Sequence, residues 1–222
     1  MELDLALTLD YELFGDGSGD IFNDLVQPTE AILKLCDRHN AKLTLFFEVV
    51  EYWQIKAEWD KGNTMGYASD PISAIKQQIT QAFQNGHDVQ LHIHPQWLES
   101  HFNQEWQVSD KWRMADIPLT SDSPSILNLE QVLAQGKATL ESLLKPISPQ
   151  YQCNIFRAGG FNILPSQPII EVLRKLNFKM DSSVFAGGYE QNSETSIDFR
   201  SLDNKKPYWH IKDNNVLNQY HG

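Results

Sequence analysis

The chain has 222 residues, of which 41% are hydrophobic and 21% charged. This size and balance predict one globular domain with a sizeable core. Its 18 Lys and Arg residues against 29 Asp and Glu residues leave a formal net charge of −11, and such a surface repels nucleic-acid phosphates and anionic lipids. No apolar run approaches the ~20 residues that span a bilayer. We therefore expect that the protein does not bind nucleic acid and has no membrane-spanning segment.

The first residues, Met-Glu-Leu-Asp-Leu, carry acidic side chains where a secretory signal would carry basic ones. The two cysteines, Cys36 and Cys153, cannot build a disulfide framework, and their spacing does not mark a metal pair. Both observations favour a cytoplasmic protein.

Predicted strands and helices alternate along the chain. Residues 3–9 place a leucine at every second position, the period that is typical of a strand. Asp70-Pro71 and Asn128 are helix-start signals, and Asn85-Gly86 and Pro146 are stop signals. In chain order the elements are strand 3–9, helix 29–38, strand 43–50, helix 70–86, strand 89–93, helix 128–145, strand 153–156, helix 166–176, and strands 178–180, 197–199 and 208–211. This alternation predicts an α/β fold built from parallel β/α units.

Two segments, near 52–69 and 97–127, interrupt this alternation within what we interpret as one domain, 1–222. Loops of this length in a compact domain usually form lids or binding walls. Five of the six tryptophans lie in these segments or at their edges, namely Trp53, Trp59, Trp97, Trp106 and Trp112. The rings of Trp97, Trp106 and Trp112 either stack on the flat face of a ligand or pack together in a small loop core.

Two carboxylates, Asp10 and Glu12, follow the first predicted strand. In a parallel β/α fold, functional sites are built at the carboxyl ends of the strands. Paired carboxylates suit a metal site or general-base chemistry. The alternative is that they only cap a turn.

Two histidines, His92 and His94, lie two residues apart at the end of strand 89–93, where Pro95 ends the strand. This spacing points both imidazoles to one face, a common way to present nitrogen ligands to a divalent metal such as Zn²⁺. His87 lies at the other end of the strand, and we expect it to be structural.

A cation and a third acid follow later strands. Arg157 ends strand 153–156 and could hold a carboxylate such as Asp10 ionised and oriented. The glycines after it, Gly159 and Gly160, permit a tight turn and a close approach of substrate. Asp181 either supports Arg157 or initiates a turn.

Taken in order, four segments resemble the motifs of the NodB-homology polysaccharide deacetylase family. They read L-T-L-D-Y-E, G-H-D-V-Q-L-H-I-H-P, F-R-A-G-G-F-N and M-D-S-S, and the resemblance covers about residues 5–188. It implies a deformed or incomplete (β/α) barrel. It also implies a metal-dependent hydrolase that removes acetyl groups from an N-acetylated sugar or glycan substrate, with a divalent metal, zinc first, as cofactor.

The resemblance also implies roles for individual residues. Asp10 matches the catalytic base, Arg157 the residue that orients it and Asp181 a supporting acid. Tyr11 stands at the family's usual metal-Asp position, so the acid ligand is Glu12 or Asp10. His92 and His94 take the places of the metal histidines, with a spacing two residues shorter than is common, as in a divergent branch. The expected substrate-binding residues are Trp97, Gly159, Gly160 and Asn162.

Two features depart from the family pattern. A full barrel takes about 250 residues, so the length predicts a slightly incomplete one. The family's late Leu-x-His motif has no match, and His210 and His221 are the only late histidines. Two alternatives follow, a metal-independent amidohydrolase of the same fold and a non-catalytic carbohydrate-binding barrel. A glycosidase that uses Asp10 and Glu12 is disfavoured because their spacing hardly permits opposition across a sugar ring.

Overall fold

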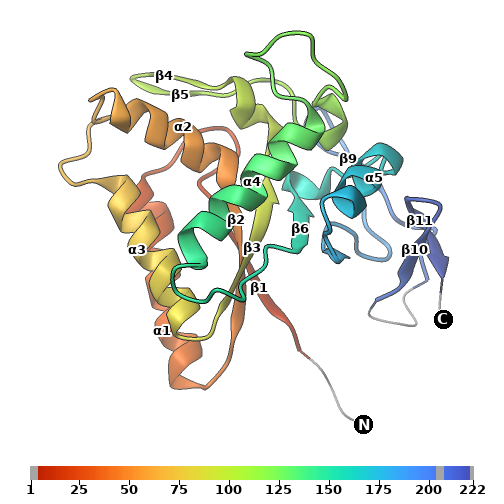
Figure 1. Cartoon of the computed structure of the whole chain (residues 1–222), viewed down its shortest axis with the longest axis horizontal. Coiled ribbons are helices and arrows are strands. Elements are labelled where there is room, and N and C mark those ends of the chain that lie inside the picture. Colours follow the sequence, from red (N-terminus) through yellow and green to blue (C-terminus); the bar gives the residue numbers. More distant parts are fainter. Residues whose placement is uncertain (1–4, 204–207, 221–222) are drawn as a thin grey trace.

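A computed structural model describes residues 5–203 and 208–220 of the chain. At its centre, five parallel strands form one sheet in the order β1-β2-β3-β6-β7 (Figure 1). These strands are β1 (Leu7–Tyr11), β2 (Leu43–Glu48), β3 (Asp88–Ile93), β6 (Ile155–Ala158) and β7 (Met180–Asp181). The helices are α1 (Gln27–Arg38), α2 (Val49–Asp60), α3 (Pro71–Gln84), α4 (Leu129–Leu144) and α5 (Gln167–Lys175). The α/β class and the parallel sheet are confirmed.

The helix starts follow the capping residues that the sequence indicates. The Asp70 carboxylate accepts hydrogen bonds from the backbone N–H groups of Ile72 and Ser73 at the start of α3, with Pro71 as the first helical residue. Asn128 and Gln131 exchange hydrogen bonds at the start of α4. These contacts satisfy amide groups that the first turn of a helix leaves unpaired.

Residues 52–60 differ from the expected insertion, because they continue helix α2. The sequence does not predict this helix for two reasons. Its buried side chains do not lie along one face of the helix, and the apolar residues of strand β2 continue into its first turn, so the boundary between strand and helix carries no signal. The segment 97–127 does leave the β/α pattern. It contains the short antiparallel hairpin of β4 (His101–Asn103) and β5 (Glu105–Gln107), the end of a 3-10 helix (Pro95–Glu99), a second 3-10 helix (Met114–Asp116) and turns. Figure 1 shows this hairpin above α2, beyond the carboxyl ends of the central strands.

The last two predicted strands lie outside the parallel sheet. One is β9 (Ser196–Asp198), which pairs with β8 (Tyr189–Gln191), and the other is β10 (His210–Lys212), which pairs with β11 (Asn215–Tyr220). Both pairs are antiparallel hairpins. Among the described residues the parallel sheet therefore has five strands and two edges, β1 and β7, and closure into a barrel stays a prediction.

The two edges of the sheet nevertheless approach each other at one point. Nη2 of Arg157 lies 3.1 Å from Oγ1 of Thr8 on β1 and 3.0 Å from Oγ of Ser182, which follows β7. The two hydroxyl oxygens are therefore separated by at most the sum of these distances. In a flat sheet, edges four strand spacings apart would lie roughly 19 Å from each other. The sheet is strongly curled.

The two faces of this curled sheet have opposite character. Strand alternation directs one set of side chains toward the helices, and this set is apolar: Leu45, Phe47, Val89, Leu91, Ile93 and Phe156. The register places the other set on the inner face: Thr8, Asp10, Phe46, Glu48, Gln90, His92 and Arg157. The two-residue period of the strands thus places the apolar core residues on one face of the sheet and the candidate site residues on the other.

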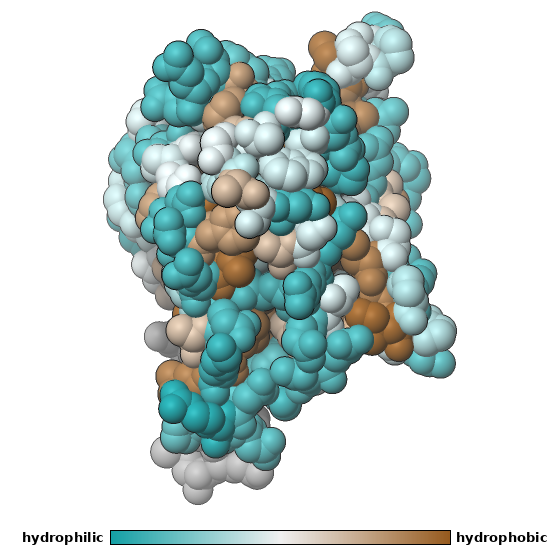
Figure 2. All heavy atoms as spheres, turned by 90° about the vertical axis from the view of Figure 1, so that its left-hand side faces the viewer, coloured by the Kyte–Doolittle hydropathy of each residue, from teal (hydrophilic) through white to brown (hydrophobic). Residues whose placement is uncertain are grey.

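The strands are added in chain order, and right-handed crossovers then place the connecting helices on one face of the sheet. Two contacts agree with this. Tyr11 donates a hydrogen bond to Gln78 of α3, and Gly136 of α4 packs closely on Leu91. The surface that α1 to α3 present to solvent is mostly hydrophilic, with scattered apolar patches (Figure 2). No helix in the described parts of the chain is long and apolar enough to cross a membrane.

Candidate metal centre

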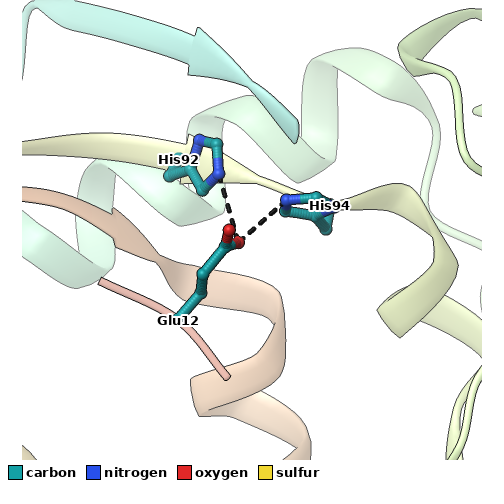
Figure 3. Close-up of side chains that lie close together, drawn as sticks. All are labelled: Glu12, His92 and His94. Carbon is teal, nitrogen blue, oxygen red and sulfur yellow. Dashed lines mark ion pairs between the residues drawn. The ribbon is translucent and has the colours of Figure 1, made fainter. Parts of the chain in front are cut away.

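Glu12, His92 and His94 meet at the carboxyl end of the sheet (Figure 3). Oε2 of Glu12 lies 3.2 Å from Nε2 of His92 and 2.8 Å from Nε2 of His94. The three potential ligand atoms lie within 4.8 Å of one another. Both histidines are buried, and Glu12 is partly buried. The convergence that the sequence predicts for these three residues is present, and they could hold a metal ion.

The hydrogen bond at the far side of the His92 ring fixes its tautomer. Nδ1 of His92 lies 2.9 Å from the backbone carbonyl oxygen of Arg157, which can only accept a hydrogen bond. Nδ1 therefore carries the proton, and the lone pair of neutral His92 lies on Nε2. Metal-binding histidines are oriented in this way, with the second nitrogen donating to a carbonyl or carboxylate.

Charge compensation is the central feature of this site. The lone pair on Nε2 of His92 faces a carboxylate oxygen of Glu12, and two acceptors repel each other unless a proton or a metal cation lies between them. Burial alone would lower the pKa of His92, but the charge of Glu12 and the contact with it raise that pKa overall. Burial alone would raise the pKa of Glu12, and the two histidines reverse this and lower it. The three side chains are therefore arranged so that they could hold positive charge, either as protons or as a metal cation.

His94 has a second polar partner, Gln96, whose amide orientation determines which ring nitrogen of His94 carries the proton. Its Nδ1 lies 2.8 Å from Nε2 of Gln96, and an amide nitrogen in this place donates, which leaves the proton of His94 on Nε2. If the amide were reversed, its oxygen would accept from Nδ1–H and free Nε2 to bind a metal. Oε1 of Gln96 is buried without a hydrogen-bond partner in the observed orientation.

Strand alternation explains why Glu12, not Tyr11, is the ligand candidate. Tyr11 stands at the position that the family resemblance gives to a metal-binding aspartate, but its side chain is buried toward the helices and bonds Gln78. Glu12 and Asp10 point to the opposite face. Asp10 is paired with Arg157, which leaves Glu12 for the histidines.

Asp10 and Arg157 form the second half of the site. Nη1 of Arg157 lies 2.6 Å from Oδ1 of Asp10. The guanidinium carbon lies 3.9 Å from the centre of the Phe46 ring, and the remaining nitrogens bond Thr8 and Ser182. This contact between Arg157 and Asp10 is the one expected from the sequence, and its several partners hold the guanidinium in one orientation.

Asp181 has the turn-initiating role that the sequence left as an alternative. Its carboxylate accepts hydrogen bonds from the backbone N–H and the hydroxyl of Ser183, and that hydroxyl accepts from the N–H of Ala158. Burial raises the pKa of Asp181 to about 6, against the opposing effects of Ser183 and Arg157. No hydrogen bond or ion pair between Asp181 and Arg157 occurs within the described chain, and the neighbour that contacts Arg157 is Ser182.

Two buried carboxylates that sequence analysis missed support the metal ligands. Oε2 of Glu48 accepts the backbone N–H of His94 at 2.6 Å, and Oε2 of Glu51 accepts the N–H of Leu13, next to Glu12, at 2.9 Å. Burial raises the pKa of both acids, and the charge of Glu12 raises both further. The signal that could have found them is a Glu-x-x-Glu after an apolar run, at the same strand ends as the other site residues.

The four expected substrate-binding residues have different surroundings. Trp97 is 1% exposed and packs edge to face on Trp106, so it belongs to a loop core and offers no face to a sugar. A Cβ atom on Gly159 would lie 2.4 Å from the His94 ring, and this glycine therefore makes room for a ligand candidate. Gly160 has a φ of 55°, in the left-handed region. Asn162 is buried and joins neighbouring loops through the carbonyl groups of Trp112 and Glu194.

A pocket of about 410 Å³ lies beside His94. The loop after β1, the 97–127 segment and the loops after β6 and β8 form its walls. The lining includes Phe14, Asp16, His94, Trp112, Gly160 and Glu194. This volume falls within the range of small-molecule sites.

Of the two late histidines, His210 is an exposed residue of β10, and His221 lies outside the described residues. Comparisons with protein-family models, with curated proteins and with solved structures found no match.

Proposed function

We propose that this protein is a metal-dependent hydrolase that removes an acetyl group from an N-acetylated sugar or glycan intermediate, as its resemblance to the polysaccharide deacetylases implies. The observation that carries the proposal is the convergence of Glu12, His92 and His94, with the His92 proton held on Nδ1 by a backbone carbonyl. The strong curl of the sheet supports a barrel-like wrap around this centre.

Zinc suits the donor set. Two imidazole nitrogens and one carboxylate oxygen are typical of catalytic zinc, where three protein ligands leave a position open. The buried Nε2 atoms of His92 and His94 and Oε2 of Glu12 face one another and have no other polar partner, as expected for atoms that bind a cation. When bound, the ion lowers the pKa of a water molecule toward ~7 and polarises the acyl carbonyl.

The chain supplies the proton transfers. Asp10 accepts a proton from the attacking water, and the Arg157 guanidinium holds the Asp10 carboxylate in position. The water oxygen bonds to the acyl carbon, the proton taken up by Asp10 passes to the amide nitrogen, and the carbon–nitrogen bond breaks, which releases acetate and the protonated amine. Gly160 lines the adjacent pocket, where its lack of a side chain allows the acyl group a close approach.

Acetate release from N-acetylglucosamine oligomers tests this function. We expect zinc-loaded protein to release acetate, and His92→Ala protein and chelator-treated protein to lose the activity. His39→Ala is the matched control, because His39 is exposed and precedes β2, at the opposite end of the sheet. Full activity in metal-free protein would instead support the metal-independent amidohydrolase. Sugar binding without acetate release by zinc-loaded protein would support the non-catalytic barrel.

A further inference from the structure

The pocket beside His94 contains side chains that no motif of the chain accounts for. Phe14, Asp16, Trp112 and Glu194 line it, and they come from loops rather than from strand ends. His94, itself a metal-ligand candidate, lies in the same wall, so a molecule in this pocket is held next to the candidate centre.

An indole ring forms one wall of the pocket. A Cβ atom on Gly15 would lie 3.2 Å from the Trp112 ring, so the absence of a side chain at Gly15 lets this ring pack on the backbone. The backbone carbonyl of Trp112 accepts a hydrogen bond from buried Asn162. Trp112 stays partly exposed, and Phe14 on the neighbouring loop is 59% exposed. Aromatic surface at the mouth of a pocket is typical of ligand contact, and rings of this kind pack on the apolar faces of sugars.

The charge of the walls is negative. Asp16 and Glu194 line the pocket, and no Lys or Arg is among its lining residues. Asp10 and Glu12 add two carboxylates nearby, and Arg157, which is paired with Asp10, is also committed to Thr8 and Ser182. An anionic ligand would meet like charge in a pocket whose lining includes no lysine or arginine to pair with it.

We propose that this pocket selects uncharged or amine-bearing N-acetylated sugars and rejects phosphorylated or carboxylated ones, with Trp112 as the platform and Asp16 and Glu194 as the specificity residues. The inference rests on the proposed function and names its substrate class. It also fits the product of that reaction, because deacetylation creates an amine that is a cation at neutral pH, and carboxylates in the wall attract it.

The test compares the binding of N-acetylglucosamine and N-acetylglucosamine 6-phosphate by titration calorimetry, with metal-free protein so that turnover plays no part. We expect the neutral sugar to bind at least tenfold more tightly than its phosphate. In the double variant Asp16→Asn, Glu194→Gln this ratio should fall below about threefold. Glu30→Gln with Glu171→Gln is the matched control, because it removes the same charge from exposed positions on α1 and α5 and should keep the tenfold ratio.

Trp112→Ala should weaken binding of both sugars at least tenfold, and Trp112→Phe should restore part of it. Equal or tighter binding of the phosphate by the unaltered chain would overturn the proposal, as would an unchanged ratio in the Asp16, Glu194 variant. Absence of sugar binding by both metal-free and zinc-loaded protein would also overturn it. The readout is separate from catalysis. Selective binding without acetate release contradicts only the proposed function, and acetate release without selectivity contradicts only this inference.

Discussion

Asp10 and Glu12 leave the same strand two residues apart and point to the same face, but their partners differ in kind. Asp10 faces the guanidinium of Arg157, and Glu12 faces the imidazoles of His92 and His94. A guanidinium stays charged at any pH that a protein tolerates. An imidazole can exchange its proton for a metal ion near neutral pH. The first pair therefore holds a fixed charge, and the second is a place where a cation can enter.

Replacing each of the two carboxylates by an amide, one at a time, should give the largest changes in zinc affinity and activity. Glu12→Gln should weaken zinc binding about 100-fold or more, because it removes the only charged ligand candidate of the triad. Asp10→Asn should keep zinc affinity within about threefold but abolish acetate release, because it removes the proposed base. Competition with a chromophoric chelator measures the affinities. A larger loss of zinc in the Asp10 variant would reverse the assignment of the two acids.

Removing Arg157 should mainly affect stability and the Asp10 half of the site. Arg157→Ala leaves Asp10 without its cation and removes the bonds that join the two sheet edges at Thr8 and Ser182, so we expect a loss of about 2–3 kcal/mol in the free energy of unfolding. Urea unfolding of metal-free protein measures this loss. Arg157→Lys should recover part of it, because lysine keeps the charge but not the planar fork. Zinc affinity should change less than threefold, and a large change would show that the two halves are not separate.

Glu48→Gln should have an intermediate effect on the Glu12 half. This carboxylate fixes the backbone of His94, and loss of a supporting partner typically costs 10–100-fold in metal affinity. We expect about a tenfold loss, measured by the same chelator competition. Glu58→Gln, at a partly buried position near the end of α2, is the control and should bind zinc normally. Equal zinc affinities for the Glu48 and Glu58 variants would show that Glu48 does not support the metal ligands.

Asp181 gives the smallest expected effect, and it appears in the pH dependence. Its folded-state pKa of about 6 is higher than the ~3.9 of an unfolded aspartate, so the folded protein binds the proton more tightly. Stability from this group is present below pH ~4 and is lost as the pH rises through about 6. We expect Asp181→Asn to flatten the pH profile of the unfolding free energy by about 1 kcal/mol between pH 4 and 7. Parallel profiles for the two proteins would contradict the assignment.

The sequence was most informative where strand period and strand ends act together. Asp10, Glu12, His92 and His94 each lie at a strand end with a spacing of two, and parallel strands bring such ends to one edge. Pairing of Arg157 with Asp10 followed from the need to compensate an acid. The contact between Arg157 and Asp10 depends on the curl of the sheet, and no local sequence pattern predicts that curl.

Other parts could not be predicted because their roles depend on tertiary contacts. Glu48 and Glu51 support the ligands from the start of α2, a helix hidden by an apolar run that continues from its strand. Trp97 and Trp112 belong to the same segment, but Trp97 is buried and Trp112 lines the pocket, and only the tertiary packing distinguishes them. Asp181 and Ser182 are neighbours, and strand alternation gives Ser182 the contact with Arg157.

A crystal structure of zinc-loaded protein, with data collected at the zinc absorption edge, tests the central claim most directly. We expect one anomalous peak within bonding distance of Nε2 of His92, Nε2 of His94 and the carboxylate of Glu12. Asp10 should remain paired with Arg157, and the Gln96 carbonyl should face Nδ1 of His94. A peak bound by Asp10 in place of Glu12, or no peak at this triad, would contradict the account.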